Sequence, residues 1–332
     1  MSARPPSAED EFVARLIRPL SGEGAFNLMD DAARVTAPRE HELVLTADAI
    51  VVGVHALPED PPDLIARKAL RMNLSDIAAK GAKPLGFLMT LAVPKTTDQA
   101  WLTRFFEGLK ADCESFACPL LGGDTTRTPG PLSVSITLIG AARPGRMPTR
   151  LDARSGDVIG VTGTIGDAAL GLIQRRAPER AAGWNLSVAE REHLASRYLL
   201  PQPRIELAEI IARHARAAMD VSDGLVGDLE RLCRASGLSA QLDADEVPLS
   251  PAARKALVAD HASIESILGG GDDYEILLTL ERESWSSFSA ECEVKGIAAT
   301  LIGETVSGEP GTVRVMQADR ELVLEQTAFS HL

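Results

Sequence analysis

Aspartates recur in this sequence at places where an acidic side chain is costly unless it has a use. Seven short segments each carry one or two of them inside an apolar run or a glycine-rich turn. The segments are Asp30-Asp31, Thr46-Ala47-Asp48, 73–76, 122–127, 162–167, 220–224 and 269–275. Any one of them alone would most often be a cap or a turn, because Asp and Asn are common at both. Seven such segments in one chain favour a single site in which these acids act together.

These acids need a nearby positive charge or another form of neutralisation. A carboxylate flanked by Val and Leu must be paired, protonated or metal-bound, because burying an unpaired charge costs several kcal/mol. The basic residues near the seven segments are fewer than the acids, namely Arg34, Arg67, Arg71, Arg127 and Arg150. Divalent cations are the expected compensation. Mg²⁺ prefers oxygen ligands and keeps water and phosphate in its shell, so the pattern predicts a magnesium–phosphate site.

The familiar phosphate-binding motifs are missing. The sequence has no Gly-x-x-x-x-Gly-Lys-Ser/Thr loop and no Gly-x-Gly-x-x-Gly fingerprint, which disfavours P-loop, dinucleotide and protein-kinase sites. The glycines at 122–123 and 269–271 are the remaining candidates for a phosphate-binding backbone. We expect them to form turns whose bare backbone approaches phosphate or passes between ligands.

The elements that position the first acids follow from the spacing of apolar residues. Residues 63–80 and 97–116 have helical spacing, and the second run opens with Thr97 and Asp98 as a cap. Runs rich in Val, Ile, Leu and Thr predict strands at 42–54, 84–93 and 132–142. A short helix is expected at 11–20, ended by Pro19.

A second alternating pattern starts after the Pro- and Gly-containing stretch near 145–150, where we place a domain boundary at 147/148. It predicts strands at 157–163, 218–221 and 276–280, and helices at 205–216 and 224–236. Strands that alternate with helices are typical of an α/β protein.

Composition narrows the class of protein. The 332 residues include 34 Lys and Arg against 47 Asp and Glu, a net charge of −13, which excludes free nucleic acid as a partner. The four cysteines, Cys113, Cys118, Cys233 and Cys292, form no Cys-x-x-Cys pair and are expected to be free thiols. No apolar run is long enough for a membrane helix, and residues 1–11 lack a signal-peptide core. We therefore predict a soluble, cytoplasmic protein with no membrane partner.

The acidic segments, taken in order, resemble those of the thiamine-monophosphate kinase family. The most specific strings are Asn-Leu-Ser-Asp at 73–76, Gly-Gly-Asp-Thr-Thr-Arg at 122–127 and Val-Ser-Asp-Gly-Leu at 221–225. The resemblance implies the ATP-binding superfamily of aminoimidazole ribonucleotide synthetase, selenophosphate synthetase and a hydrogenase-maturation dehydratase. We therefore expect a two-domain α/β (α+β) fold. Residues 1–147 would bind ATP and Mg²⁺ and form a barrel in a homodimer, and 148–332 would complete the active site.

The resemblance also implies roles for individual residues. The expected magnesium ligands are Asp31, Thr46, Asp48, Asp76, Asp124, Asp220 and Asp223, of which Asp48, Asp76 and Asp124 are expected to be essential for catalysis. The expected ATP contacts are Gly123, Asp124, Arg150 and Ser222, and the expected substrate contacts are His55, Asp272 and Phe329. For His55, Arg150 and Phe329 an ordinary structural role stays open, since lone histidines, surface cations and terminal aromatic residues usually have one.

The implied reaction is the last step of thiamine diphosphate synthesis. The γ-phosphoryl of ATP passes in line to the phosphate of thiamine monophosphate, which gives thiamine diphosphate and ADP with several Mg²⁺ ions present. The acceptor oxygen is already an anion at pH 7. Catalysis would therefore rest on positioning and charge neutralisation, without a general base.

Three residues depart from the family pattern. Met29 stands where a glycine is usual, Ala47 replaces a hydroxyl residue, and Asp272 replaces a glutamate that is one methylene longer. None of these departures removes a charge from the expected metal ligands.

Other readings stay open. A selenophosphate synthetase would need a reactive cysteine near the N-terminus, whereas the first is Cys113. The dehydratase would need a C-terminal cysteine, and 329–332 has none. A non-catalytic nucleotide-binding module would be favoured if the metal ligands were missing.

Overall fold

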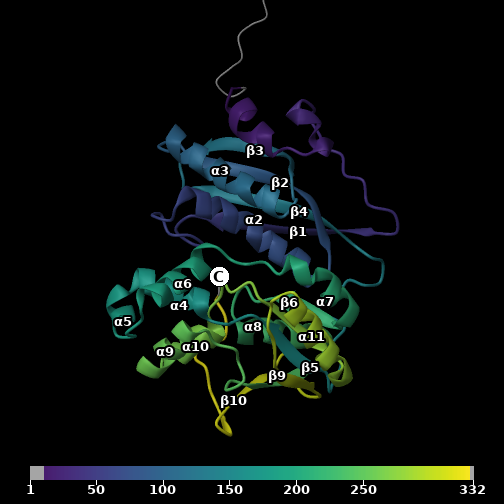
Figure 1. Cartoon of the computed structure of the whole chain (residues 1–332), viewed down its shortest axis with the longest axis vertical. Coiled ribbons are helices and arrows are strands. Elements are labelled where there is room, and N and C mark those ends of the chain that lie inside the picture. The colour runs from purple at the N-terminus through teal and green to yellow at the C-terminus, as the bar shows by residue number, and fades with distance from the viewer. Residues whose placement is uncertain (1–10, 330–332) are drawn as a thin grey trace, which may run out of the picture. The chain divides into compact units, whose positions relative to one another are not determined.

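The computed structural model describes residues 11–329 and divides them into two compact units (Figure 1). The first unit holds residues 11–74 and 83–143, and the second holds 75–82 and 144–329. Residues 1–10, which belong to the stretch predicted to lack a signal-peptide core, lie outside the described part, as do residues 330–332. The sequence boundary at 147/148 did not anticipate that 75–82, which includes the last turn of a helix, groups with the second unit.

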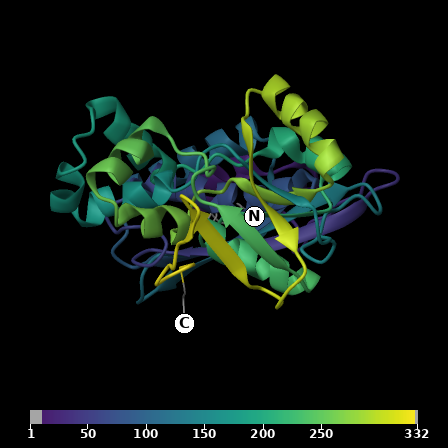
Figure 2. The ribbon, with the colours of Figure 1, turned by 90° about the horizontal axis from the view of Figure 1, so that it is seen from below.

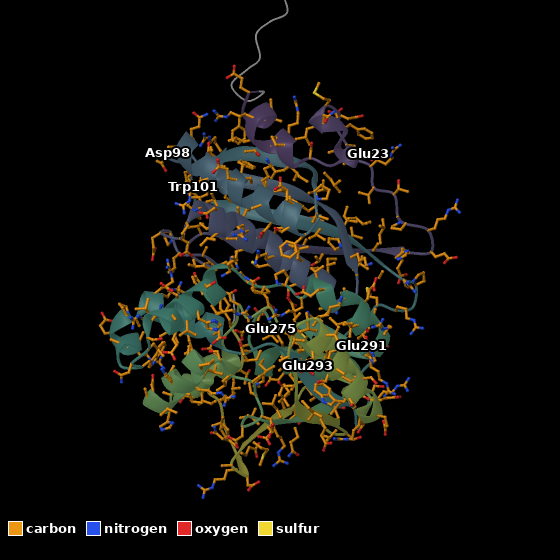
Figure 3. The ribbon with its side chains drawn as sticks, in the orientation of Figure 1. Glu23, Asp98, Trp101, Glu275, Glu291 and Glu293 are labelled. Carbon is orange, nitrogen blue, oxygen red and sulfur yellow. The ribbon has the colours of Figure 1, made fainter. Side chains whose placement is uncertain are left out.

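The first unit is a four-stranded sheet with two long helices. Its elements are η1 (Val13–Ile17), η2 (Arg18–Leu20), η3 (Glu23–Leu28), β1 (Glu42–Val51), α2 (Pro62–Ala79), β2 (Lys83–Pro94), α3 (Gln99–Ser115), β3 (Leu120–Thr128) and β4 (Ser133–Ala142). The strand order is β1-β4-β2-β3, and only the β2–β3 pair is parallel. Asp98 caps α3 by accepting a hydrogen bond from the Trp101 N–H at 2.8 Å, as the sequence predicts (Figure 3).

The two faces of this sheet differ. Val44 and Ile50 on β1 are buried, whereas Leu43 and Leu45, the residues on either side of Val44, are 43% and 64% exposed. Leu88 of β2, whose register places it on the same face as Leu45, is 40% exposed. Side chains of a strand alternate between faces. One face of the sheet is therefore buried within the unit, and the other is open and partly apolar.

The second unit is a seven-stranded sheet with helices on both faces. Its strands are β5 (Val158–Thr162), β6 (Ala217–Asp220), β7 (Ser239–Asp243), β8 (Ile276–Leu280), β9 (Ala299–Val306), β10 (Val313–Gln317) and β11 (Arg320–Glu321), in the order β11-β10-β7-β9-β5-β8-β6. Its helices are α4 (Asp167–Arg176), α5 (Pro178–Ala182), α6 (Val188–Leu199), η4 (Ile205–Leu207), α7 (Ala208–His214), α8 (Leu225–Ser236), α9 (Pro251–Ala259), α10 (Ser263–Gly269), η5 (Arg282–Ser284) and α11 (Trp285–Val294).

Two apolar cores sandwich this second sheet. Ala217 and Met219 of β6 pack into one core with α4, α6, α8, α9 and α10, whereas Ala218 packs into the other with α7 and α11. Figure 2 shows α11, in yellow-green, and α9 and α10, in green, on different sides of the strands. Because both faces are buried, strands such as β5 and β8 are apolar along their whole length.

Most predicted elements are confirmed, and three differ. Within the helix predicted at 11–20, residues 13–20 form a π turn and a 3₁₀ turn, and 205–216 begins as a 3₁₀ turn. Residues 122–127, expected to be a turn, lie within β3. Gly123 explains the difference, because a Cβ there would lie 1.8 Å from the Met89 carbonyl oxygen of β2. Within residues 11–329 no helix is long and apolar enough to cross a membrane.

The contact between α3 and the start of α2 gives a test of packing in the first unit. A Cβ at Gly108 would lie 2.4 Å from the Asp63 carbonyl oxygen. Gly108→Ala should therefore lower the free energy of unfolding by about 1–3 kcal/mol in chemical denaturation, despite the better helix propensity of alanine. Gly130→Ala is the matched control, because its Cβ would meet nothing closer than 3.5 Å. Equal effects of the two substitutions would contradict this packing.

Candidate active site

In the second unit, predicted site residues meet at the end of β6. Asp220 ends that strand, is 4% exposed, and pairs with Ile276 of β8. The Asp272 N–H donates to the Ser222 carbonyl oxygen at 2.8 Å, and the Phe329 N–H donates to the Asp223 carbonyl oxygen at 2.8 Å. Segments distant in sequence are therefore joined here by backbone hydrogen bonds.

The glycines of 269–271 make this junction possible. A Cβ at Gly271 would lie 2.2 Å from the Ser222 carbonyl oxygen, and one at Gly269 would lie 2.4 Å from the Gln326 carbonyl oxygen. Gly224 has a φ of +131° and a missing Cβ that faces Gly269. These glycines allow protein backbones to approach one another. This packing accounts for the glycine run within the protein, and the approach of the backbone to phosphate stays a prediction.

One buried carboxylate holds the loop after β6. Asp228 of α8 accepts hydrogen bonds from the N–H groups of Ser222 and Asp223, both at 3.0 Å. Burial raises the pKa of the Asp228 carboxyl, and Arg231 bonds to both Asp228 and Asp223, at 2.6 and 2.5 Å. The expected metal ligand Asp223 is thus ion-paired here. The three-residue spacing of Asp228 and Arg231 on a helix is a signal that could have revealed this cation.

Lys80 bonds to the backbone of two segments that carry predicted site residues. Its Nζ donates to the carbonyl oxygens of Ala218 at 2.6 Å and Pro148 at 3.4 Å. Burial and Arg150 lower the pKa of Lys80 to about 8, while Asp220 and Asp76 act to raise it. The structure therefore brings Asp76, Arg150 and Asp220 into one electrostatic environment. The sequence analysis predicted no role for Lys80.

In the first unit, Thr46 and Asp48 lie on the same side of β1 as the buried Val44 and Ile50. The Asp48 N–H donates to Oδ1 of Asn73 on α2 at 3.0 Å. The asparagine of the string at 73–76 therefore fixes the backbone at the predicted ligand.

Asp124 lies elsewhere on the same sheet. Asp48 of β1 pairs with Ile136 of β4, Ile136 pairs with Met89 of β2, and Met89 pairs with Gly123 of β3, which together make one row of paired residues across the sheet. Asp124 follows Gly123 and therefore belongs to the neighbouring row. Neighbouring rows face opposite sides of a sheet. Two strands lie between β1 and β3, so the Cα atoms of Asp48 and Asp124 are about 14 Å apart across the sheet. The first unit alone does not bring Asp48 and Asp124 together.

The remaining predicted residues of the first unit lie in turns. Asp31 is exposed, and its N–H donates to Oδ1 of Asp30 at 2.7 Å. The Val51 N–H donates to Nδ1 of His55 at 3.0 Å, so the neutral ring carries its proton on Nε2. This bond gives the His55 ring a structural contact, and its role as a substrate contact stays a prediction. Met29 adopts an ordinary right-handed backbone.

The predicted magnesium ligands are divided between the units. Asp31, Thr46, Asp48 and Asp124 belong to the first, and Asp76, Asp220 and Asp223 to the second. Among residues 11–329, no three His, Cys, Asp or Glu side chains gather closely enough to hold a metal ion.

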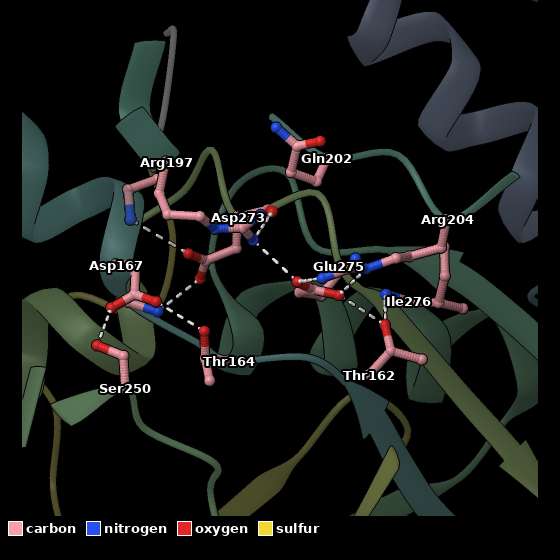
Figure 4. Close-up of polar contacts among 12 residues, drawn as sticks. Thr162, Thr164, Asp167, Arg197, Gln202, Arg204, Ser250, Asp273, Glu275 and Ile276 are labelled. Atoms are coloured by element: carbon pink, nitrogen blue, oxygen red, sulfur yellow. Dashed lines mark hydrogen bonds and ion pairs between the residues drawn. The ribbon is translucent and has the colours of Figure 1, made fainter. Parts of the chain in front are cut away.

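Other acids of the seven segments belong to a buried polar network (Figure 4). Glu275 is fully buried and accepts hydrogen bonds from Arg197 at 2.8 Å, Arg204 at 2.7 Å and Thr162 at 2.8 Å. Asp273 is also fully buried, which raises its pKa well above the ordinary value, and it accepts the Gly166 N–H at 2.7 Å.

The adjacent Asp167, first residue of α4, completes this network. Burial alone would raise its pKa, but hydrogen bonds from His193, Ser250 and Thr164 outweigh burial and lower it. The expectation that arginines are too few to pair the acids is therefore wrong for this half of the chain. Arg197 and Arg204 are far from the acids in sequence and adjacent to them only in the fold.

Comparison with known proteins first defines the class. Residues 29–142 match the family model of the AIR synthase related protein, N-terminal domain, and residues 154–316 match that of the C-terminal domain. The chain is thus a two-domain AIR synthase-related protein. Its relatives identify the family within that class.

A Thiamine-monophosphate kinase of Caulobacter vibrioides is 41% identical over 313 residues, which cover 92% of this chain and 86% of that protein. The crystal structure of Thiamine-monophosphate kinase from Stenotrophomonas maltophilia K279a is 34% identical, with a TM-score of 0.82 over 95% of this chain and 98% of that one. A structure described as AaThiL complexed with AMPPCP and TMP is 29% identical, with a TM-score of 0.77 over 93% and 97%. The chain belongs to the thiamine-monophosphate kinase family.

The buried Glu275 network can be tested by stability. Glu275→Gln leaves Arg197 and Arg204 without their shared carboxylate, so the free energy of unfolding should fall by about 3–5 kcal/mol. Glu291→Gln is the control, since Glu291 is 39% exposed and pairs with Arg213 and His214 on α7 (Figure 3). Exposed pairs contribute little, so this variant should unfold as the parent does. A parent-like Glu275→Gln would contradict the network.

Proposed function

We propose that this protein transfers the γ-phosphoryl group of ATP directly to the phosphate of thiamine monophosphate, which yields thiamine diphosphate and ADP. The observation that carries the proposal is the match to curated thiamine-monophosphate kinases over nine-tenths of the chain. A relative solved in complex with AMPPCP, an ATP analogue, and TMP supports the choice of both substrates.

The proposed ligands fit Mg²⁺ by their chemistry. All seven supply carboxylate or hydroxyl oxygens, which are the donors that this ion prefers. We propose that Asp48, Asp76 and Asp124 are the essential ligands, supported by the other four, namely Asp31, Thr46, Asp220 and Asp223. Asp223 fits least well, because Arg231 already pairs with it. When bound, Mg²⁺ would neutralise charge on the phosphates of both substrates.

Residues around the loop after β6 would bind and orient the substrates. Ser222, with Gly123, Asp124 and Arg150, is proposed to contact ATP. Asp272, which Ser222 holds through its backbone, would place a carboxylate near the cationic thiazolium of the substrate. Phe329 is 43% exposed, and its ring could stack on that cation. His55 is proposed as the third substrate contact.

We further propose that the protein is a homodimer whose interface includes the open face of the first sheet. This face exposes Leu43, Leu45 and Leu88, and Asp124 lies on it by register. A second copy packed there would bury the leucines and place its own residues beside Asp124. That arrangement would account for a site that one unit leaves incomplete.

The interface is tested by Leu45→Glu, which should convert a dimer to monomers in sedimentation-velocity analysis, because it places charge in an apolar contact. Val294→Glu is the control, since Val294 is 85% exposed on α11 and should leave the mass unchanged. A monomeric parent protein, or a Leu45→Glu variant that remains dimeric, would contradict this interface.

The activity is tested by incubating the protein with ATP and Mg²⁺, and with either thiamine monophosphate or thiamine. Fluorescence chromatography should reveal thiamine diphosphate from the monophosphate only. Asp124→Asn should lower kcat at least about a hundredfold without changing the unfolding midpoint, because Asp124 is exposed. Glu293→Gln removes an exposed charge on α11 and should remain active. No product with the monophosphate, although ATP binds, would refute the proposed function.

A further inference from the structure

Tyr274 is a buried tyrosine for which the sequence predicted no role, and its hydroxyl meets a proposed substrate contact. The Oη of Tyr274 donates a hydrogen bond to Oδ1 of Asp272 at 3.3 Å. Tyr274 is only 3% exposed, whereas Asp272 is partly exposed. The bond therefore links a ring fixed inside the second unit to a carboxylate that solvent can reach.

The backbone of this pair has an uncommon conformation. Asp272 and Tyr274 have φ angles of +73° and +50°, in the left-handed region that residues other than glycine rarely adopt. An aspartate tolerates this region, but a tyrosine there is strained, and such strain persists only where the surrounding structure holds it. Residues of this kind cluster at ligand-binding sites, so the conformation indicates that the position of the tyrosine side chain matters.

Hydrogen bonds on both sides hold the strained turn. The Tyr274 N–H donates to the Val221 carbonyl oxygen at 2.8 Å, beside the bond from the Asp272 N–H to the loop after β6. Asp273, between the two, is fully buried and turns into the polar network, where its carboxylate accepts the Gly166 N–H at 2.7 Å. The tyrosine hydroxyl is thus presented from a rigid backbone.

We propose that Tyr274 is a positioning residue, which orients the Asp272 carboxylate toward the thiazolium cation of thiamine monophosphate and touches neither substrate itself. This inference rests on the proposed function. Asp272 replaces a glutamate that is one methylene longer, so its carboxylate stays close to the turn that carries the hydroxyl. A carboxylate oriented before the substrate arrives loses less conformational freedom on binding, which strengthens binding.

A purely structural role for the hydroxyl predicts a different pattern. If the hydroxyl only stabilised the turn, its loss would also disturb Ser222, the proposed ATP contact that is bonded to the Asp272 backbone. The KM values of both substrates would then change. If the hydroxyl orients the carboxylate, the backbone bond stays and only the KM of thiamine monophosphate changes. The two KM values therefore separate the roles.

The informative variant is Tyr274→Phe, because phenylalanine keeps the buried ring and removes only the hydroxyl. In steady-state assays the KM of thiamine monophosphate should rise about three- to tenfold, with kcat and the KM of ATP unchanged. Tyr198→Phe is the matched control, since Tyr198 is the only other tyrosine of the chain, is 2% exposed, and lies on α6 beneath the Arg175 guanidinium. It should keep the KM values of the parent protein.

Asp272→Ala provides a second test. This variant should raise the KM of thiamine monophosphate at least as much as Tyr274→Phe does. Adding Tyr274→Phe to it should change that KM no further, because the hydroxyl would have no carboxylate to orient. Independent, multiplying effects of the two substitutions would refute the positioning role.

Failure of this inference can be told apart from failure of the proposed function. If the parent protein forms thiamine diphosphate while Tyr274→Phe keeps the parent KM, or changes the KM of ATP equally, the role of Tyr274 is refuted and the function stands. A parent protein that forms no product from thiamine monophosphate would refute the proposed function and this inference with it.

Discussion

Compensation of buried negative charge is the constraint on which this structure depends. A carboxylate removed from water must meet a cation or several hydrogen-bond donors, and the chain meets this need in two ways. Glu275 and Asp228 receive arginines from their own unit, and Asp273 receives backbone N–H groups. Others, such as Asp220, which is 4% exposed, are those for which we propose magnesium.

The structural acids serve the proposed site by holding its backbone. Asp228 fixes the N–H groups of Ser222 and Asp223, and Asp273 and Glu275 anchor the residues that follow Asp272. The glycines allow the same loops to touch at backbone distance. An enzyme that relies on positioning needs such rigidity. The acidic motifs are therefore partly a scaffold and partly, as we propose, a site.

Local sequence patterns predicted most of the elements and less of the contacts. The helix at 63–80 and the cap at Asp98 follow from spacing and capping chemistry, which are local properties, and the structure confirms both. The strand at 122–127 was mistaken for a turn, because Gly123 is required by the approach of Met89, which is 34 residues away in sequence. The pairing of Arg197 and Arg204 with Glu275 was missed for the same reason, since it joins residues more than 70 positions apart. The division of the expected ligands between two units also depends on tertiary structure.

The dependence of turnover on metal tests the central claim most directly. The protein is stripped of divalent ions with EDTA, desalted, and assayed for thiamine diphosphate from ATP and thiamine monophosphate as MgCl₂ is restored. The account predicts no product without metal, recovery on addition of Mg²⁺, and an unfolding midpoint of the stripped protein that shows the fold intact. Undiminished formation of thiamine diphosphate by the metal-free protein would contradict it, because the acids would then have no cation through which to act on the phosphates.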